Sequence, residues 1–239
     1  MRQVFRTLPW ILPKEPPEFV EFFHRCGKMH LLDKGQALTH GGDTGEVALL
    51  VDGLVSFSFV DVNSTHHIFA LVLTDRAIGD LDALNPLGTN VLAECIRPSR
   101  VLTVTNEQYR AFLRESVQRM ELYADLAILK EECELEGTFA NFTLDLDARL
   151  RILLYALYAS FGIVVKPSVW YPCPLALTVT EFAQIVAANR SWVSTKFSEW
   201  CKLGLIRKTC RTIECQSELF APIHDWMKTN QNALPHVMQ

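Results

Sequence analysis

Residues 177–206 read LTVTEFAQIVAANRSWVSTKFSEWCKLGLI, and this stretch decides the fold of the C-terminal part of the chain. The pattern predicts a short helix over 180–188 and a second helix that begins after the N-cap residue Asn189 and ends at Gly204. Both helices have apolar residues at helical spacing, which predicts the following inward-facing set: Phe182, Ala183, Ile185, Val186, Val193, Phe197 and Trp200. The alanines at 187 and 188 are small enough for two helices to cross steeply there, so the stretch predicts a helix-turn-helix.

A predicted β-hairpin follows the second helix. Residues 205–207 and 212–214 are rich in apolar and β-branched side chains, and residues 209–211 lie between them as the turn. Helix, turn, helix and two-stranded wing together indicate a winged helix-turn-helix. The alternative is a helical hairpin that only packs against the rest of the protein.

The outer face of the second helix favours the DNA-binding interpretation. Its side chains are small, polar or basic and include no carboxylate, which suits entry into a major groove. Glu199 is expected to turn away from DNA. The predicted DNA-binding residues are Asn189, Arg190, Ser191, Ser194, Thr195, Lys196 and Ser198.

The charge distribution agrees with this interpretation. The net charge is −4, but residues 1–165 carry 15 basic and 22 acidic side chains, whereas residues 166–239 carry 8 basic and 5 acidic ones. A basic C-terminal unit beside an acidic remainder is typical of a local nucleic-acid surface, although a solvated charged face would give the same count.

Residues 29–105 are predicted to form an antiparallel β domain. Short runs of apolar and β-branched residues alternate with turn signals roughly every 8–12 residues. No ten-residue helical pattern interrupts these runs, which disfavours a parallel βαβ sheet.

Residues 106–141 are predicted to be helical, with Asn106 as the N-cap and a long helix from Ser116 to about Ala140. Leu122, Leu126, Leu129 and Cys133 lie on one face, and Arg119, Lys130, Glu131 and Glu134 are expected on the opposite one. The long helix is either a connector packed on its own domain or a coiled-coil seam between two chains. Another helix is predicted from Asp145 to Ser160.

The quoted residues resemble the DNA-binding domain of CRP/FNR transcription regulators, without gaps over residues 177–206. The N-terminal half is similar as well: Lys34-Gly35, Gly42-Asp43 and Asp52-Gly53 look like early turns of the cyclic-nucleotide-binding β-roll. Gly79-Asp80-Leu81 stands where that family carries Gly-Glu-Leu. The resemblance spans about 17–220.

The resemblance implies an α+β protein: an antiparallel β-roll (jelly-roll) at 17–105, a linker and dimerisation helix at 106–141, a winged helix-turn-helix at 142–222 and a tail at 223–239. It implies a homodimer on double-stranded DNA, with Leu122, Leu126, Leu129 and Cys133 as the seam. RNA polymerase is an expected partner if the protein activates transcription.

A small-molecule effector is expected in the β-roll. Its predicted contacts are Gly79, Asp80, Leu81, Thr89, Asn90, Phe57 and Phe69. Thr89 and Asn90 replace the Arg-Ser/Thr pair that holds a cyclic-nucleotide phosphate in the family, so cyclic AMP is disfavoured. Cys26 stands alone before Cys95, which disfavours an iron–sulfur cluster.

Other classes have weaker support. The adjacent residues His66 and His67 would point to opposite faces of a strand, which disfavours a metal enzyme and leaves haem ligation as a minor alternative. A thiol switch at Cys201 or Cys210 and a family member that acts only through protein contacts stay open. Motifs of nucleophilic, P-loop or dinucleotide-binding enzymes are absent from the sequence. A cytoplasmic location without membrane contact is expected.

Overall fold

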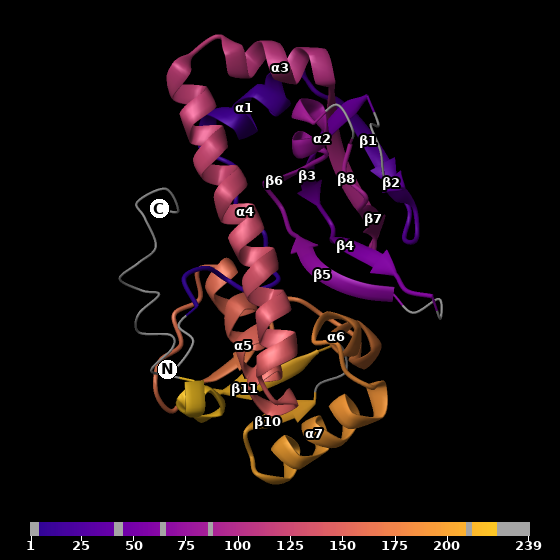
Figure 1. Cartoon of the computed structure of the whole chain (residues 1–239). Coiled ribbons are helices and arrows are strands. Elements are labelled where there is room, and N and C mark those ends of the chain that lie inside the picture. Colours follow the sequence, from indigo (N-terminus) through magenta and orange to yellow (C-terminus); the bar gives the residue numbers. More distant parts are fainter. Residues whose placement is uncertain (1–4, 41–44, 63–65, 86–87, 209–211, 224–239) are drawn as a thin grey trace. The chain divides into compact units, whose positions relative to one another are not determined.

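The computed structural model describes residues 5–40, 45–62, 66–85, 88–208 and 212–223 (Figure 1). The chain divides into two compact units. Of the described residues, the β-roll unit contains 12–132, and the C-terminal unit contains 5–11 together with 133–223. The boundary therefore lies inside the long helix, whereas the sequence had separated a linker at 106–141.

The β-roll unit contains two antiparallel four-stranded sheets, as the sequence predicts. One sheet has the order β1-β8-β3-β6 and the other the order β2-β7-β4-β5. The strands are β1 (Lys28–Leu32), β2 (Ala37–His40), β3 (Glu46–Asp52), β4 (Val55–Val60), β5 (His66–Val72), β6 (Arg76–Ile78), β7 (Leu92–Cys95) and β8 (Ser99–Thr105). Ala70, Val72, Ala93 and Val101 belong to an apolar core that draws on both sheets.

Helices cover a second core of the same unit. These helices are α1 (Pro17–Cys26), α2 (Asp80–Leu84), α3 (Asn106–Arg114) and the first part of α4 (Val117–Thr143). Phe22 of α1 stacks on Phe112 of α3 with ring centroids 4.2 Å apart. The N-cap of α3 is Thr105, whose side chain accepts a hydrogen bond from Gln108 N–H. The prediction of Asn106 as the cap is therefore wrong, and Asn106 is buried.

The C-terminal unit contains a helix-turn-helix with a small sheet. Its elements are α5 (Leu146–Ser160), β9 (Trp170–Pro172), α6 (Val179–Ile185), α7 (Arg190–Lys202), β10 (Ile206–Lys208), β11 (Ile213–Gln216) and a 3₁₀ helix (Ser217–Ile223). The predicted wing is formed by β10 and β11, which pair antiparallel with Ile206 opposite Cys215 and Lys208 opposite Ile213, and β11 also pairs with β9. The predicted helix after Asp145 is confirmed, with Asp145 as its N-cap.

An N-terminal arm, residues 5–11, belongs to the C-terminal unit and was missed by the sequence analysis. Trp10 is fully buried, and its backbone N–H donates to the Cys133 carbonyl of α4 at 3.2 Å. Thr7 hydrogen-bonds the carboxylate of Glu136 through its hydroxyl. A Cβ atom at Gly137 would lie 2.6 Å from Cδ1 of Trp10, so this glycine makes room for the arm.

Candidate nucleic-acid interface

Helix α7 has an apolar face that fixes its position in the C-terminal unit. Val193, Phe197 and Trp200 are buried, as predicted. Phe197 contacts Phe182 of α6 edge-to-face, with ring centroids 5.2 Å apart. Since these residues recur every third or fourth position, they orient the opposite face of the helix to solvent.

The solvent face of α7 carries a row of small polar side chains beside the exposed ring of Trp192. Ser191, Thr195 and Ser198 are exposed and recur at the same helical spacing, and Lys202 continues the row. Short hydroxyl side chains let a helix backbone come close to base edges, where they donate or accept. A DNA major groove admits a helix with such a face.

The first turn of α7 holds two more of the predicted residues. The Asn189 side chain accepts hydrogen bonds from the backbone N–H of Ser191 at 2.9 Å and from its hydroxyl at 2.8 Å. Asn189 therefore acts as the helix cap. Arg190 is exposed, and its side chain makes no hydrogen bond or ion pair to another residue within the described ranges. Its guanidinium is available to a guanine edge or a phosphate.

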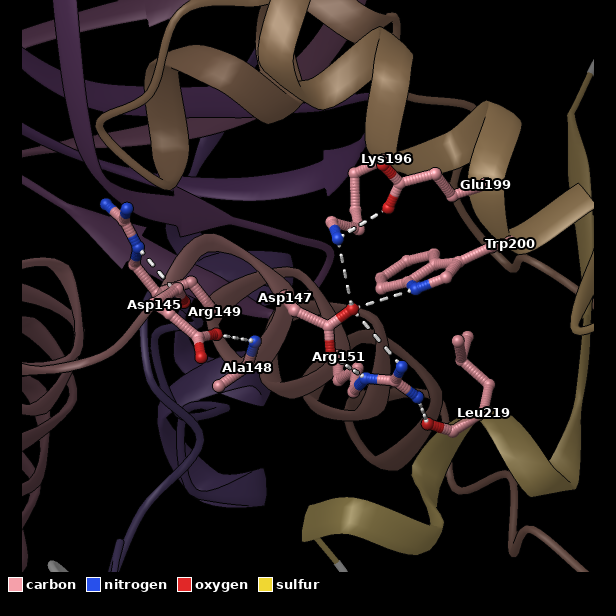
Figure 2. Close-up of polar contacts among 9 residues, drawn as sticks. All are labelled: Asp145, Asp147, Ala148, Arg149, Arg151, Lys196, Glu199, Trp200 and Leu219. Carbon is pink, nitrogen blue, oxygen red and sulfur yellow. Dashed lines mark hydrogen bonds and ion pairs between the residues drawn. The ribbon is translucent and has the colours of Figure 1, made fainter. Parts of the chain in front are cut away.

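Lys196 is held by carboxylates on the flank of α7. Its ammonium donates to Glu199 at 2.6 Å and lies 3.8 Å from Asp147 of α5. Figure 2 shows this group with Asp147 at its centre. The hydrogen bond to Glu199 is the main cause of the raised pKa of Lys196. Of the predicted DNA-binding residues, Lys196 is thus already engaged within the protein, and Ser194 is half-buried.

Asp147 links α5 to α7. Its carboxylate accepts from the indole N–H of Trp200 at 3.0 Å and from the guanidinium of Arg151 (Figure 2). Arg151 also donates to the carbonyl of Leu219 in the 3₁₀ helix and lies over the Trp200 ring. Burial by itself would raise the pKa of Asp147, but the hydrogen bond and charge of Arg151 outweigh it and lower that pKa. The sequence analysis missed Asp147, although an i, i+4 Asp–Arg pair after the Asp145 cap was a visible signal.

Two basic side chains lie on β10, the wing strand that follows α7 in the chain. Arg207 of β10 stacks on Trp170 with its guanidinium carbon 4.6 Å from the ring centroid, and it pairs with Glu214. Lys208 is exposed. The turn at 209–211, with Cys210, lies outside the described residues, so the thiol-switch hypothesis has no structural test there. Burial raises the pKa of Cys173 to about 11 and that of Cys215 to about 12, so both stay thiols at neutral pH.

The predicted effector contacts separate into three places in the β-roll unit. Phe57 and Phe69 contact each other across β4 and β5, with ring centroids 6.3 Å apart. The backbone N–H of Thr89 donates to Asp82 at 2.5 Å, and Asn90 is exposed. Gly79, with a φ of 80°, and half-buried Leu81 flank Asp80 at the start of α2.

Asp80 was predicted to contact an effector, but its carboxylate is paired within the protein. Its side chain is 5% exposed and accepts a hydrogen bond from Lys130 at 2.8 Å. Lys130 was expected on the solvent side of α4, and this prediction is wrong, because its side chain is 3% exposed. A lone lysine among apolar helix positions was the signal that could have identified it.

The predicted dimer seam needs a similar correction. Leu126 and Cys133 are buried within the chain, and Leu122 and Leu129 are half-buried. Leu122 packs against the second core of the β-roll unit. Leu126 and Cys133 therefore face their own chain, and a seam role for the half-buried Leu122 and Leu129 stays a prediction. Val117 and Met120 near the start of α4 are exposed, and so are four apolar side chains further along the helix, which we call the α4 seam: Ile128, Leu135, Phe139 and Phe142.

The remaining hypotheses concern histidines and membranes. His66 is exposed, whereas His67 pairs with Asp61 at 3.0 Å and stacks on Phe59. Within the described residues, no three His, Cys, Asp or Glu side chains gather in a way that could hold a metal ion. None of the described helices combines the length and the apolar character that a membrane span requires.

Comparison with solved structures identifies the fold. No protein-family model and no curated protein matches the sequence. FixK2 from Bradyrhizobium japonicum has a TM-score of 0.66 and 17% identity, with 81% of this chain and 95% of that chain covered. TTHA1359, a CRP/FNR-family transcriptional regulator from Thermus thermophilus, has a TM-score of 0.58 and 16% identity, with 85% and 98% covered. CprK in complex with OCPA has a TM-score of 0.62 and 18% identity, with 89% and 97% covered. The chain thus has the fold of CRP/FNR transcription regulators, as its sequence pattern predicts.

Proposed function

We propose that this protein is a dimeric transcription regulator that binds double-stranded DNA through α7. The observation that carries the proposal is the solvent face of that helix. Ser191, Thr195 and Ser198 form an exposed row without a carboxylate, and the guanidinium of the adjacent Arg190 has no hydrogen-bond or ion-pair partner in the part of the chain that the structure describes. A bidentate arginine reads the O6 and N7 atoms of guanine, while short hydroxyls fit several bases.

The dimer is supported by the α4 seam. Ile128, Leu135 and Phe142 are spaced by seven residues, and Phe139 lies one turn after Leu135. Phe142 is 82% exposed and Ile128 58% exposed, which is unusual for apolar side chains on one stripe of a helix. A seven-residue apolar repeat is the pattern by which two helices pair. A two-fold dimer would present two α7 helices to successive major grooves, about 34 Å apart.

Regulation by a small-molecule effector in the β-roll is the second part of the proposal. The effector is not expected to be cyclic AMP, because Thr89 and Asn90 supply no guanidinium for a phosphate. RNA polymerase is the expected protein partner if the regulator activates transcription, and the expected location is the cytoplasm.

The test is selection of random duplex DNA by the purified full chain, repeated with Arg190→Ala. We expect the wild type to enrich a two-fold symmetric site, and we expect Arg190→Ala to lose that enrichment. Arg25→Ala is the matched control, since Arg25 is an exposed arginine in the β-roll unit. Equal enrichment by all three proteins would contradict base recognition by Arg190 of α7. If no site is enriched, the result would favour a protein that acts through protein contacts.

A further inference from the structure

The β-roll unit contains a buried cluster of three charged side chains from distant parts of the sequence. The Lys130 ammonium of α4 donates to Glu15 at 2.8 Å and to Asp80 at 2.8 Å. The side chains of Lys130, Glu15 and Asp80 are 3%, 0% and 5% exposed. Taking three charges out of water is costly unless they satisfy one another, so the geometry around the ammonium must be well defined.

The acidic half of this cluster is held by the β-roll independently of Lys130. The Glu15 carboxylate also accepts the backbone N–H of Ala77 in β6 at 3.1 Å. Asp80 is the first residue of α2 and follows Gly79, whose φ of 80° sets the turn. These contacts fix the two carboxylates where a single cation can reach both.

The cluster holds more acceptor capacity than Lys130 uses. It contains two carboxylates and one ammonium, and the second oxygen of Glu15 is buried without a hydrogen-bond partner among the described residues. The Glu15 side chain that carries this oxygen is fully buried, and its other oxygen accepts from the Lys130 ammonium. The site is therefore built for a cation with several N–H donors, and a primary ammonium provides three.

We propose that Glu15 and Asp80 form a binding site for a primary ammonium, that Lys130 is its internal ligand, and that occupancy of this site holds the first half of α4 in the DNA-binding state. The site joins the β6 and α2 segments to α4, so an empty site would release the helix that carries part of the α4 seam. The second part of this inference rests on the proposed function, whereas the ammonium site itself does not.

The test converts the internal ligand into an external one. Lys130→Ala removes the atoms from Cγ to Nζ, and n-propylammonium supplies the same three carbons and nitrogen. We expect Lys130→Ala to lose affinity for the selected DNA by at least about tenfold, since a buried pair of carboxylates is left without its cation. Millimolar n-propylammonium should restore most of that affinity and raise the melting temperature of the variant, because a ligand that binds only the folded state stabilises it.

Three controls make the outcome specific. Wild type should show no change with n-propylammonium, and 1-propanol should not rescue Lys130→Ala because it has no charge. Lys130→Met fills the same space with an apolar chain, so it should fold, lose DNA affinity and resist rescue. If Lys130→Ala does not fold, the loss of DNA affinity is measured on Lys130→Met. Rescue is then measured as the yield of folded Lys130→Ala after refolding in n-propylammonium.

The two parts fail in different ways. If n-propylammonium changes neither the melting temperature nor the refolding yield of Lys130→Ala, the ammonium site is overturned. If it raises the melting temperature while Lys130→Ala binds DNA as tightly as wild type, the link to α4 is overturned. If wild type enriches no DNA, the proposed function fails, and the melting temperature still decides the ammonium site.

Discussion

At the scale of single residues, Ala187 marks the corner between α6 and α7. Its φ of 47° is in the left-handed region, which an L-residue with a Cβ occupies at a cost of about 1–2 kcal/mol. We predict that Ala187→Gly raises the free energy of unfolding by up to about 1 kcal/mol, since glycine relieves the strain but adds chain entropy. Four of the five tryptophans belong to the C-terminal unit, namely Trp10, Trp170, Trp192 and Trp200, and Trp226 lies outside the described residues. Tryptophan fluorescence in a urea titration therefore follows mainly this unit.

The matched control for this change is the next residue. Ala188 has no positive φ, and its backbone N–H donates to Ala183 at 2.9 Å. Ala188→Gly should therefore lower stability by about 0.5–1 kcal/mol. A loss of stability in Ala187→Gly equal to that in Ala188→Gly would contradict the assigned backbone strain.

Asp147 gives a pH prediction at the same scale. Because its pKa is lowered in the folded state, its contribution to stability is present above the unfolded pKa of about 3.9 and is lost as the pH falls through the folded value. We expect Asp147→Asn to be less stable at pH 7 by about 1.5–3 kcal/mol, since its hydrogen bonds involve charged groups. Its stability should also fall less steeply with acid than that of wild type, as measured by urea titrations at several pH values.

Asp145→Asn is the control for Asp147→Asn. Asp145 lies on the same turn and caps α5 by accepting the Ala148 N–H at 2.8 Å, and asparagine is an equally good cap. Its stability should stay close to that of wild type. If both variants behave alike, the network around Asp147 does not anchor α7.

At the scale of elements, α4 is the decisive helix, since it has apolar residues on two faces. One face is buried within the chain and the other carries the α4 seam. We predict that wild type sediments as a dimer and that Leu135→Glu sediments as a monomer, because a glutamate there would meet its own copy across the seam. Leu31→Glu on β1 is the control, since Leu31 is 76% exposed and lies outside the seam. A dimer that survives Leu135→Glu would place the interface elsewhere.

At the scale of the whole molecule, local sequence signals predicted most of the fold. The Asn189 cap, Gly204 and the apolar positions of α6 and α7 each indicate the helix-turn-helix, and the alternation of short apolar runs with turn signals predicted the antiparallel strands of the β-roll unit. These signals depend only on residues that are close in the chain, so they can be read without knowledge of the tertiary structure.

The long-range features could not be predicted in the same way. Periodicity identifies an apolar stripe on α4 but not what covers it, so Leu126 and Cys133 were predicted to lie between two chains although they are buried within their own. The N-terminal arm has prolines and no periodicity, yet Trp10 packs into the space left by Gly137. Lys130, Glu15 and Asp80 are separated by 50 residues or more, and only folding brings them together.

The measurement that tests the central claim most directly is sedimentation equilibrium of the full chain with its selected duplex, combined with the salt dependence of the affinity. We predict two chains per symmetric duplex and an affinity that falls steeply with salt, because the basic side chains displace counterions from phosphates. One chain per duplex would contradict the dimer. An affinity that does not change with salt would contradict DNA binding through the basic face of α7.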